Sequence, residues 1–156
     1  MKRVHSTLRF FGLIPTLAIS AALLTGCYNP SEGDHNSVAL GADLNFSGLQ
    51  LRSVLIVTSG QNEPGRVLGR IFNTTATDIQ VVLADSDEQL PVKIPAMGHV
   101  ELDQSPLIFN STQGLPGARA GLQVTAKGQQ ASINVPIQDG TFAQYRPYIP
   151  SASPSS

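Results

Sequence analysis

Residues 49–57, "LQLRSVLIV", indicate the fold class of this chain. Alternate residues of an extended chain point to opposite sides. One side would carry Leu49, Leu51, Ser53, Leu55 and Val57, and the other Gln50, Arg52, Val54 and Ile56. A hydrophobic repeat of two residues is typical of a half-buried β-strand. We therefore expect a strand here that packs its leucine side against a core.

The same repeat recurs further along the chain. It is clear in "DIQVVLA" at 78–84, "GLQVTAKG" at 121–128 and "SINVPI" at 132–137. By contrast, no stretch of the sequence keeps the 3.6-residue hydrophobic repeat of a helix for three turns without a Pro or Gly. We expect about seven strands, at residues 49–58, 66–73, 78–84, 89–94, 98–103, 119–127 and 131–137.

This strand pattern predicts an all-β fold. About seven short strands in roughly 100 residues, each with one polar side, favour an immunoglobulin-like β-sandwich over residues 48–149. A small barrel is the alternative architecture. The chain has one Cys and no Trp, so the Cys–Trp–Cys core of antibody domains is missing. The prediction therefore concerns the architecture alone.

The first 26 residues have the organisation of a signal peptide. Lys2, Arg3 and Arg9 form a basic start, and fifteen uncharged, mostly hydrophobic residues follow. A basic segment followed by a short hydrophobic segment and small residues is typical of secretion signals. The rival interpretation is a retained membrane-spanning helix, which needs about 20 apolar residues. Pro15 interrupts the hydrophobic run, which favours the signal peptide at residues 1–26.

The only cysteine of the chain follows this segment directly. Residues 24–27, "LTGC", resemble the bacterial lipobox, which has an aliphatic residue, two small residues and a modified cysteine. The resemblance implies that Cys27 is the lipidation site and receives a diacylglyceryl group. Cleavage before Cys27 then frees an amino group that can take a further acyl chain such as palmitate. Two or three acyl chains give stable anchoring. We therefore expect a lipoprotein that is exported and anchored to the outer face of the bacterial cytoplasmic membrane.

The segments on either side of the predicted sandwich are polar. Residues 27–47 would hold the lipidated cysteine and a flexible tether. Residues 150–156, "PSASPSS", would form a disordered tail. After cleavage the chain would carry seven Lys and Arg against eleven Asp and Glu, a net charge of −4. This balance does not favour a nucleic-acid partner.

Motifs that support catalysis are missing from the sequence. There is no Gly-x-Ser-x-Gly, no phosphate-binding loop and no His-Glu-x-x-His. We name no catalytic or cofactor-binding residue. The sequence favours a non-enzymatic module that binds an envelope protein or another envelope component.

Several segments resemble small, uncharacterised actinobacterial lipoproteins. They are "LQLRSVLIV", "PGRVLGRIFN", "IPAMGHVEL", "LPGARAGLQVTA" and "VPIQDGTFAQYRPYIP", and the resemblance covers residues 44–149. The shared motifs are structural, so they imply a fold rather than an activity. The sandwich of that group is similar to the fold of periplasmic copper chaperones, which makes a metal carrier the alternative function.

Copper chaperones bind their metal with His and Met, and few such residues are present here. Met97 and His99 would share one face of an extended segment, and His35 lies in the predicted tether. The paired His-x-Met element of the chaperones is absent. Two soft ligands rarely close a copper site, so we name no metal ligand. We expect weak Cu(I) binding at most in a competition titration, little changed by Met97→Ala or His99→Ala.

Three other segments invite a functional interpretation. Arg66 and Arg70 alternate with hydrophobic residues, which indicates either a partner-binding stripe or an edge strand protected by charge. The acidic run at residues 85–88 resembles the start of a calcium loop but lacks the later Gly and Glu, so a solvated turn is favoured. "GLPGARAG" at 114–121 precedes a strand rather than a helix, which favours a turn over a nucleotide site.

Overall fold

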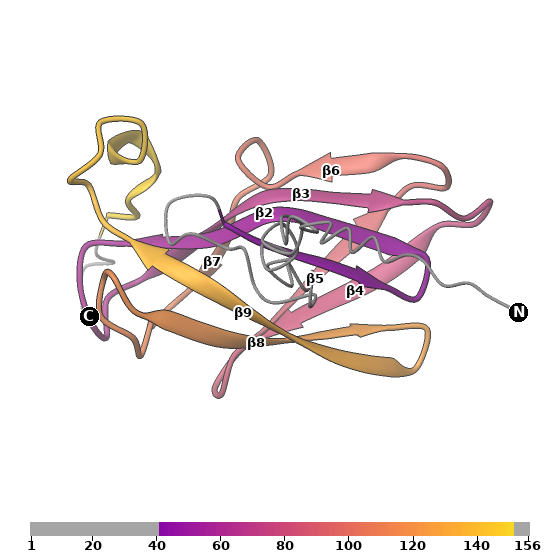
Figure 1. Ribbon diagram of the computed structural model, residues 1–156, viewed down its shortest axis with the longest axis horizontal. Coiled ribbons are helices and arrows are strands. Elements are labelled where there is room, and N and C mark those ends of the chain that lie inside the picture. The colour runs from indigo at the N-terminus through magenta and orange to yellow at the C-terminus, as the bar shows by residue number, and fades with distance from the viewer. Residues whose placement is uncertain (1–40, 152–156) are drawn as a thin grey trace, which may run out of the picture. The chain divides into compact units, whose positions relative to one another are not determined.

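The computed structural model describes residues 41–151, which form an all-β fold (Figure 1). The predicted fold class is confirmed. The segments predicted as a signal peptide or, alternatively, a membrane helix lie outside the described residues, as do Cys27 and His35. The strands are β1 Ala42–Phe46, β2 Leu49–Thr58, β3 Gly65–Asn73, β4 Ile79–Ala84, β5 Gln89–Ile94, β6 His99–Glu101, β7 Leu107–Phe109, β8 Arg119–Ala126 and β9 Gln129–Gln138. A short 3-10 helix, η1, covers Arg146–Tyr148. Residues 41–151 contain no helix with the length and hydrophobicity needed to cross a bilayer.

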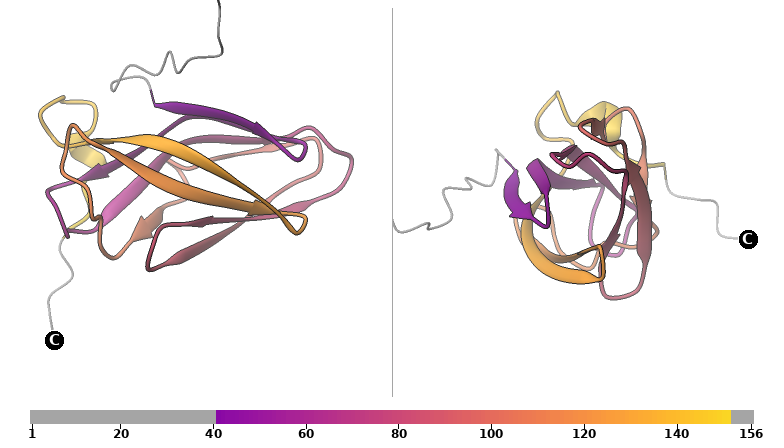
Figure 2. Two further views of the ribbon diagram at one scale, coloured as in Figure 1. Left: turned by 60° about the horizontal axis from the view of Figure 1, so that its bottom comes forward. Right: turned by 90° about the vertical axis from the view of Figure 1, so that its right-hand side faces the viewer.

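The strands form two layers that share β9. The hydrogen-bonded order is β5-β4-β8-β9-β2-β3-β6, with β1 added to β2 and β7 added to β3. β9 pairs antiparallel with β8 along its length and parallel with β2 near its end, where Ile56 lies opposite Ile137. The end-on view in Figure 2 shows the layers curving around a common interior. The sandwich is therefore nearly closed, like a barrel.

The core lies between the two layers and follows the alternation of the strands. In β4 and β8 the buried residues occupy alternate positions, because one side of each strand faces the other layer. The largest fully buried side chains are Phe109, Leu49, Leu51, Ile56, Ile71, Ile79, Leu83, Ile94, Leu102, Leu122, Ile137 and Val54.

Each of the seven predicted segments contains a strand, but the structure has two more. β7 has only three residues, too few to show a repeat. β1 falls inside the segment that the sequence assigned to the tether at residues 27–47, so that boundary is wrong. β1 is half polar, yet it pairs with β2 and packs Leu44 and Phe46 against the core. The folded part therefore begins before residue 48.

A β-bulge in β2 changes which residues face the core. Ser53 has a φ of 52°, and the pairing of β2 with β3 shifts between Arg52 and Leu55. One extra residue in a strand reverses the sides of the residues that follow it. Leu49 and Leu51 lie in the core with Val54 and Ile56, whereas Leu55 and Val57 belong to a second cluster. The prediction that the leucines and Val57 all share one side is therefore wrong beyond the bulge.

The chain after β9 covers part of the outer face of β2 and β3. Buried Leu55, Val57, Leu68 and Tyr145 form the second cluster, with Tyr148 and Ile149 packed against it. Figure 1 shows this segment, in yellow, folding beyond the end of β9. At its start Asp139 accepts the Thr141 backbone N–H at 2.8 Å, which lowers the pKa of the Asp139 carboxyl. Of the predicted tail, Pro150 and Ser151 have no regular structure, and residues 152–156 lie outside the described residues.

Candidate functional site

Polar and aromatic side chains gather on the outer face of β2, β3 and β6. The pairing of the strands aligns them in rows, because opposite residues of paired strands share a face. Gln50, Phe72 and His99 form one row; Arg52, Arg70 and Glu101 form the next; Leu55 and Leu68 form a third. The bulge in β2 is what brings Leu55 onto the same face as Arg52.

A groove of about 510 Å³ runs along this face, and we call it the outer groove. It is lined by Arg52, Ser53, Leu55, Leu68, Gly69, Arg70, Phe72, Asp103, Tyr145 and Tyr148. The floor is apolar where the C-terminal segment packs on the sheet, and the other part carries charged side chains. Most small-molecule sites combine an apolar lining with a few placed polar groups, as this groove does.

Arginines dominate the polar part of the outer groove. Arg70 Nε lies 3.1 Å from Glu101 Oε1, and the Arg70 side chain is 58% exposed. Arg52 donates through Nη1 to the Leu51 carbonyl oxygen at 2.7 Å and through Nη2 to Asn45 Oδ1 at 2.6 Å. Both arginines are thus held in place while they line the groove.

Arg66 lies further along the same face of β3. Its Nη2 donates to the Asp103 carbonyl oxygen at 2.6 Å, and its guanidinium carbon lies 5.1 Å from the centre of the Tyr148 ring. A guanidinium over an aromatic face is attracted by the negative charge of the ring. Arg66 therefore ties η1 and the loop after β6 to the sheet.

Aromatic rings flank the arginines. The rings of Phe72 and His99 stack with centroids 5.3 Å apart, and Phe142 meets Tyr145 edge-on at 6.3 Å. Tyr and Arg are the residue types that most often carry binding energy at protein interfaces. The outer groove combines arginines of the sheet with tyrosines of the segment after β9.

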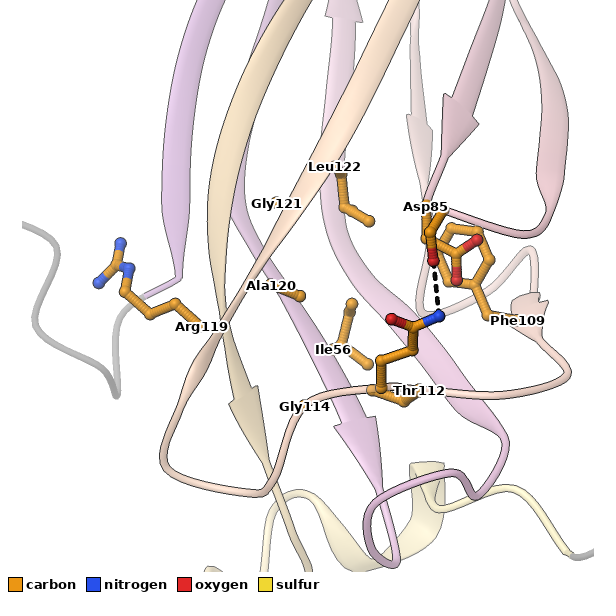
Figure 3. A pocket seen from close by; sticks show the side chains of 11 residues that line it. Ile56, Asp85, Phe109, Thr112, Gly114, Arg119, Ala120, Gly121 and Leu122 are labelled. Atoms are coloured by element: carbon orange, nitrogen blue, oxygen red, sulfur yellow. Dashed lines mark hydrogen bonds between the residues drawn. The ribbon is translucent and has the colours of Figure 1, made fainter.

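A second pocket, of about 340 Å³, lies at one end of the sandwich, and we call it the end pocket (Figure 3). It is lined by Ile56, Asp85, Ser86, Phe109, Thr112, Gln113, Gly114, Arg119, Ala120, Gly121 and Leu122. Gln113, one of the lining residues, donates through Nε2 to Ser86 Oγ and to Asp87 Oδ2, both at 2.7 Å. In Figure 3 the Arg119 side chain points away from Asp85 and Phe109. Thr112 Oγ1 is buried and has no hydrogen-bond partner among the described residues.

The structure separates the two soft ligands that the sequence singled out. Met97 has a φ of 51° in the turn after β5, where the Gly98 N–H donates to the Pro95 carbonyl oxygen at 3.1 Å. The segment is therefore not extended, and the prediction of a shared face does not apply. Met97 is 72% exposed, and the His99 ring packs on Phe72. Among residues 41–151 no three His, Cys, Asp or Glu side chains are grouped to hold a metal ion.

The structure contradicts one of the two interpretations of Arg66 and Arg70, the protected edge strand. Both lie on one face of β3 with Leu68 and Phe72, as expected. However, β3 pairs with β2 on one side and with β6 and β7 on the other, so it is not an edge strand. Protection of an edge therefore does not explain these arginines.

The acidic run and the glycine-rich run have structural roles. Asp85 Oδ1 accepts the backbone N–H groups of Asp87 at 2.9 Å and of Glu88 at 2.7 Å, which forms the turn between β4 and β5. Glu88 in turn binds the backbone and side-chain nitrogens of Asn110. The run at 114–121 leads into β8, as expected.

Sequence reasoning missed several residues of the outer groove. Regular alternation puts Arg52 on the same side as Val54 and Ile56, opposite Leu55. Only the bulge brings Arg52 and Leu55 onto one face. Tyr145 and Tyr148 lie in a segment without a periodic pattern. Their signal was composition alone, because "FAQYRPY" concentrates aromatic residues near the end of the chain.

No protein-family model and no curated protein sequence matches this chain. Solved structures with a similar arrangement of strands include two domains. The "Copper-bound PCuAC domain from PmoF2" has 9% identity and a TM-score of 0.49, covering 62% of this chain and 97% of that domain. The "Apo PCuAC domain from PmoF1" has 11% identity and a TM-score of 0.47, covering 62% of this chain and 98% of that domain. The likeness concerns the arrangement of the strands.

Proposed function

We propose that this protein is a lipid-anchored bacterial lipoprotein that acts as a non-enzymatic binding module outside the cytoplasm. Cys27 would hold it at the outer face of the cytoplasmic membrane, and the outer groove would bind an envelope protein or another envelope component. The observation that carries the proposal is the position of Arg70, which lines the outer groove on a strand that is paired on both sides. Charged residues in the middle of a sheet face need a reason other than edge protection, and binding supplies one.

The residue types of the groove support binding rather than catalysis. Arg70, Phe72 and Tyr148 offer a guanidinium group and aromatic faces, which suit recognition. His99 stacks on Phe72 and lies 3.9 Å from Glu101. Among residues 41–151, Ser53 is the only Ser, Thr or Cys that lines the outer groove, and its backbone N–H donates to Asp43 Oδ1.

Photo-crosslinking in intact cells tests the binding surface. The photoreactive amino acid p-benzoylphenylalanine replaces Phe72 in the outer groove or, as a control, Gln123 on the exposed side of β8. We expect a discrete crosslinked product from position 72 and none from position 123. Adding Arg70→Ala to the position 72 variant should reduce that product. Equal products from both positions, or a product that is insensitive to Arg70→Ala, would refute the groove as the binding surface.

The anchor is tested separately with Cys27→Ser. Without the thiol no diacylglyceryl group can be attached, so the variant should stay unlipidated and uncleaved after residue 26. Mass spectrometry of the membrane fraction distinguishes the two forms. An unmodified Cys27 thiol in the wild-type protein, or a mature N-terminus elsewhere, would contradict the proposed anchor.

A further inference from the structure

The two arginines at the middle of the outer groove oppose each other directly. Arg52 of β2 is paired with Arg70 of β3. Like charges at opposite positions of paired strands destabilise a sheet, and the usual partner is an opposite charge. The sheet therefore carries a repulsive pair of charges within the outer groove.

Acidic side chains within residues 41–151 neutralise the positive charge of Arg52 and Arg70 only in part. Within residues 41–151 the two arginines form a single ion pair, between Arg70 and Glu101. The acceptors of Arg52 are two backbone carbonyl oxygens and the side-chain oxygen of Asn45, all uncharged. Asp103 also lines the groove, but it binds Arg66 through its backbone carbonyl oxygen.

Both guanidinium groups keep donors for a further ligand. A guanidinium has five N–H groups. The hydrogen bonds of Arg52 use three of these, through Nη1 twice and Nη2 once. The ion pair of Arg70 uses Nε, and the side chain is 58% exposed. The contacts of Arg52 go to β1 and to its own strand, and the ion pair of Arg70 goes to β6, so the remaining donors of both side chains are left for a ligand in the groove that both line.

We propose that the outer groove binds the phosphate group of a phosphorylated ligand between Arg52 and Arg70. This inference rests on the proposed function, because it names the chemistry that the same groove recognises. A tetrahedral phosphate presents oxygens in several directions, which suits two guanidinium groups from neighbouring strands, whereas one arginine can cover both oxygens of a planar carboxylate. The body of the ligand lies on the apolar floor at Leu55, Leu68 and Tyr145.

Two sources supply phosphate groups outside the cytoplasm, the headgroup of a phospholipid and a soluble phosphate ester. The entry of the folded part lies beside the groove, because a Cβ at Gly41 would lie 2.3 Å from the Ser53 carbonyl carbon. Ser53 lines the groove. A lipidated Cys27 would thus tether the groove at its own margin, which makes lipid headgroups accessible to it.

The test uses isothermal titration calorimetry. Glycerol 1-phosphate is titrated into the lipidated protein, which is held in phosphatidylcholine nanodiscs. We expect saturable binding that weakens by about tenfold or more in Arg70→Gln and in Arg52→Gln, since each removes charged hydrogen bonds to the anion. Lys127→Gln is the matched control, because it removes one positive charge from the exposed turn after β8. Circular dichroism establishes that each variant is folded. A conservative Arg70→Lys should retain more affinity than Arg70→Gln.

The lipid composition distinguishes the two sources. Weaker binding of glycerol 1-phosphate in phosphatidylglycerol nanodiscs than in phosphatidylcholine nanodiscs would assign the site to a lipid headgroup, and equal binding would assign it to a soluble ester. Both results support a phosphate site. Absence of saturable binding, or binding unchanged in both glutamine variants, would overturn it. Crosslinking from position 72 would still decide on the proposed function, so the two failures are distinguishable.

Discussion

At the scale of single residues, the bulge of β2 and its partner on β3 form one unit. Ser53 has a φ of 52° and donates its N–H to Asp43 Oδ1 at 2.7 Å. Gly69, on the facing strand, has a φ of 124°. The space beside Gly69 is filled by the backbone of the bulge, where a Cβ would lie 2.8 Å from the Arg52 carbonyl oxygen. Only glycine accommodates both the conformation and the close approach.

Gly69→Ala should therefore destabilise the protein by about 1–3 kcal/mol, since it forces a strained backbone against atoms that cannot move aside. Urea denaturation measures the free energy of unfolding. Gly121→Ala is the control, because that Cβ would meet no atom within 4 Å. The control should change stability by less than about 1 kcal/mol. Equal effects of the two substitutions would refute the close approach of the bulge to Gly69.

At the scale of elements, the C-terminal segment acts as a cover on the outer face of β2 and β3. Tyr145 is 9% exposed and packs with Leu55 and Val57, which the bulge in β2 has turned outward, and with Leu68 of β3. Arg66 adds a contact with Tyr148. The segment thus forms one wall of the outer groove, and its hold on the sheet determines the shape of the groove.

Tyr145→Ala should reduce stability by about 2–4 kcal/mol, because it removes a large buried side chain from the second cluster. It should also weaken crosslinking from position 72, since Tyr145 lines the groove. Phe142→Ala is the control, because Phe142 is 50% exposed and meets Tyr145 only edge-on. Its effect on urea denaturation should stay below about 1.5 kcal/mol. A larger loss for Phe142→Ala than for Tyr145→Ala would contradict this role of the segment.

The sequence predicted the elements better than the site. Alternation identified β2, β4, β8 and β9, because each has enough residues for a repeat of two to be visible. It missed β1, whose hydrophobic residues alternate over only five positions. It could not assign Leu55 and Val57 to the outer face, because nothing in "LRSVL" distinguishes a bulge from a regular strand. The outer groove depends on that bulge and on a segment without a repeat, so of its lining residues the sequence indicates only Arg70, with Leu68 and Phe72 on the same face.

At the scale of the whole molecule, residues 41–151 contain both clusters of buried side chains. We expect this fragment to fold alone, with far-ultraviolet circular dichroism showing less than about a fifth helix, judged against ordinary helix content. A fragment that begins at residue 48 should be less stable by at least about 2 kcal/mol, because it loses Ala42, Leu44 and Phe46 from the core. Equal urea denaturation midpoints would show that β1 is dispensable.

The position of β1 has a mechanical consequence. β1 and β2 form a hairpin whose open end pairs Ala42 with Val54, and the chain enters there at Gly41. If Cys27 is held in a bilayer, a pull on the anchor acts on this open end and peels the pairs apart one after another, rather than shearing them together. The first pair to yield adjoins Ser53, at the margin of the outer groove. Tension on the anchor would thus act first on a pair at the margin of the groove, and a load too small to unfold the sandwich would still change what the groove can hold.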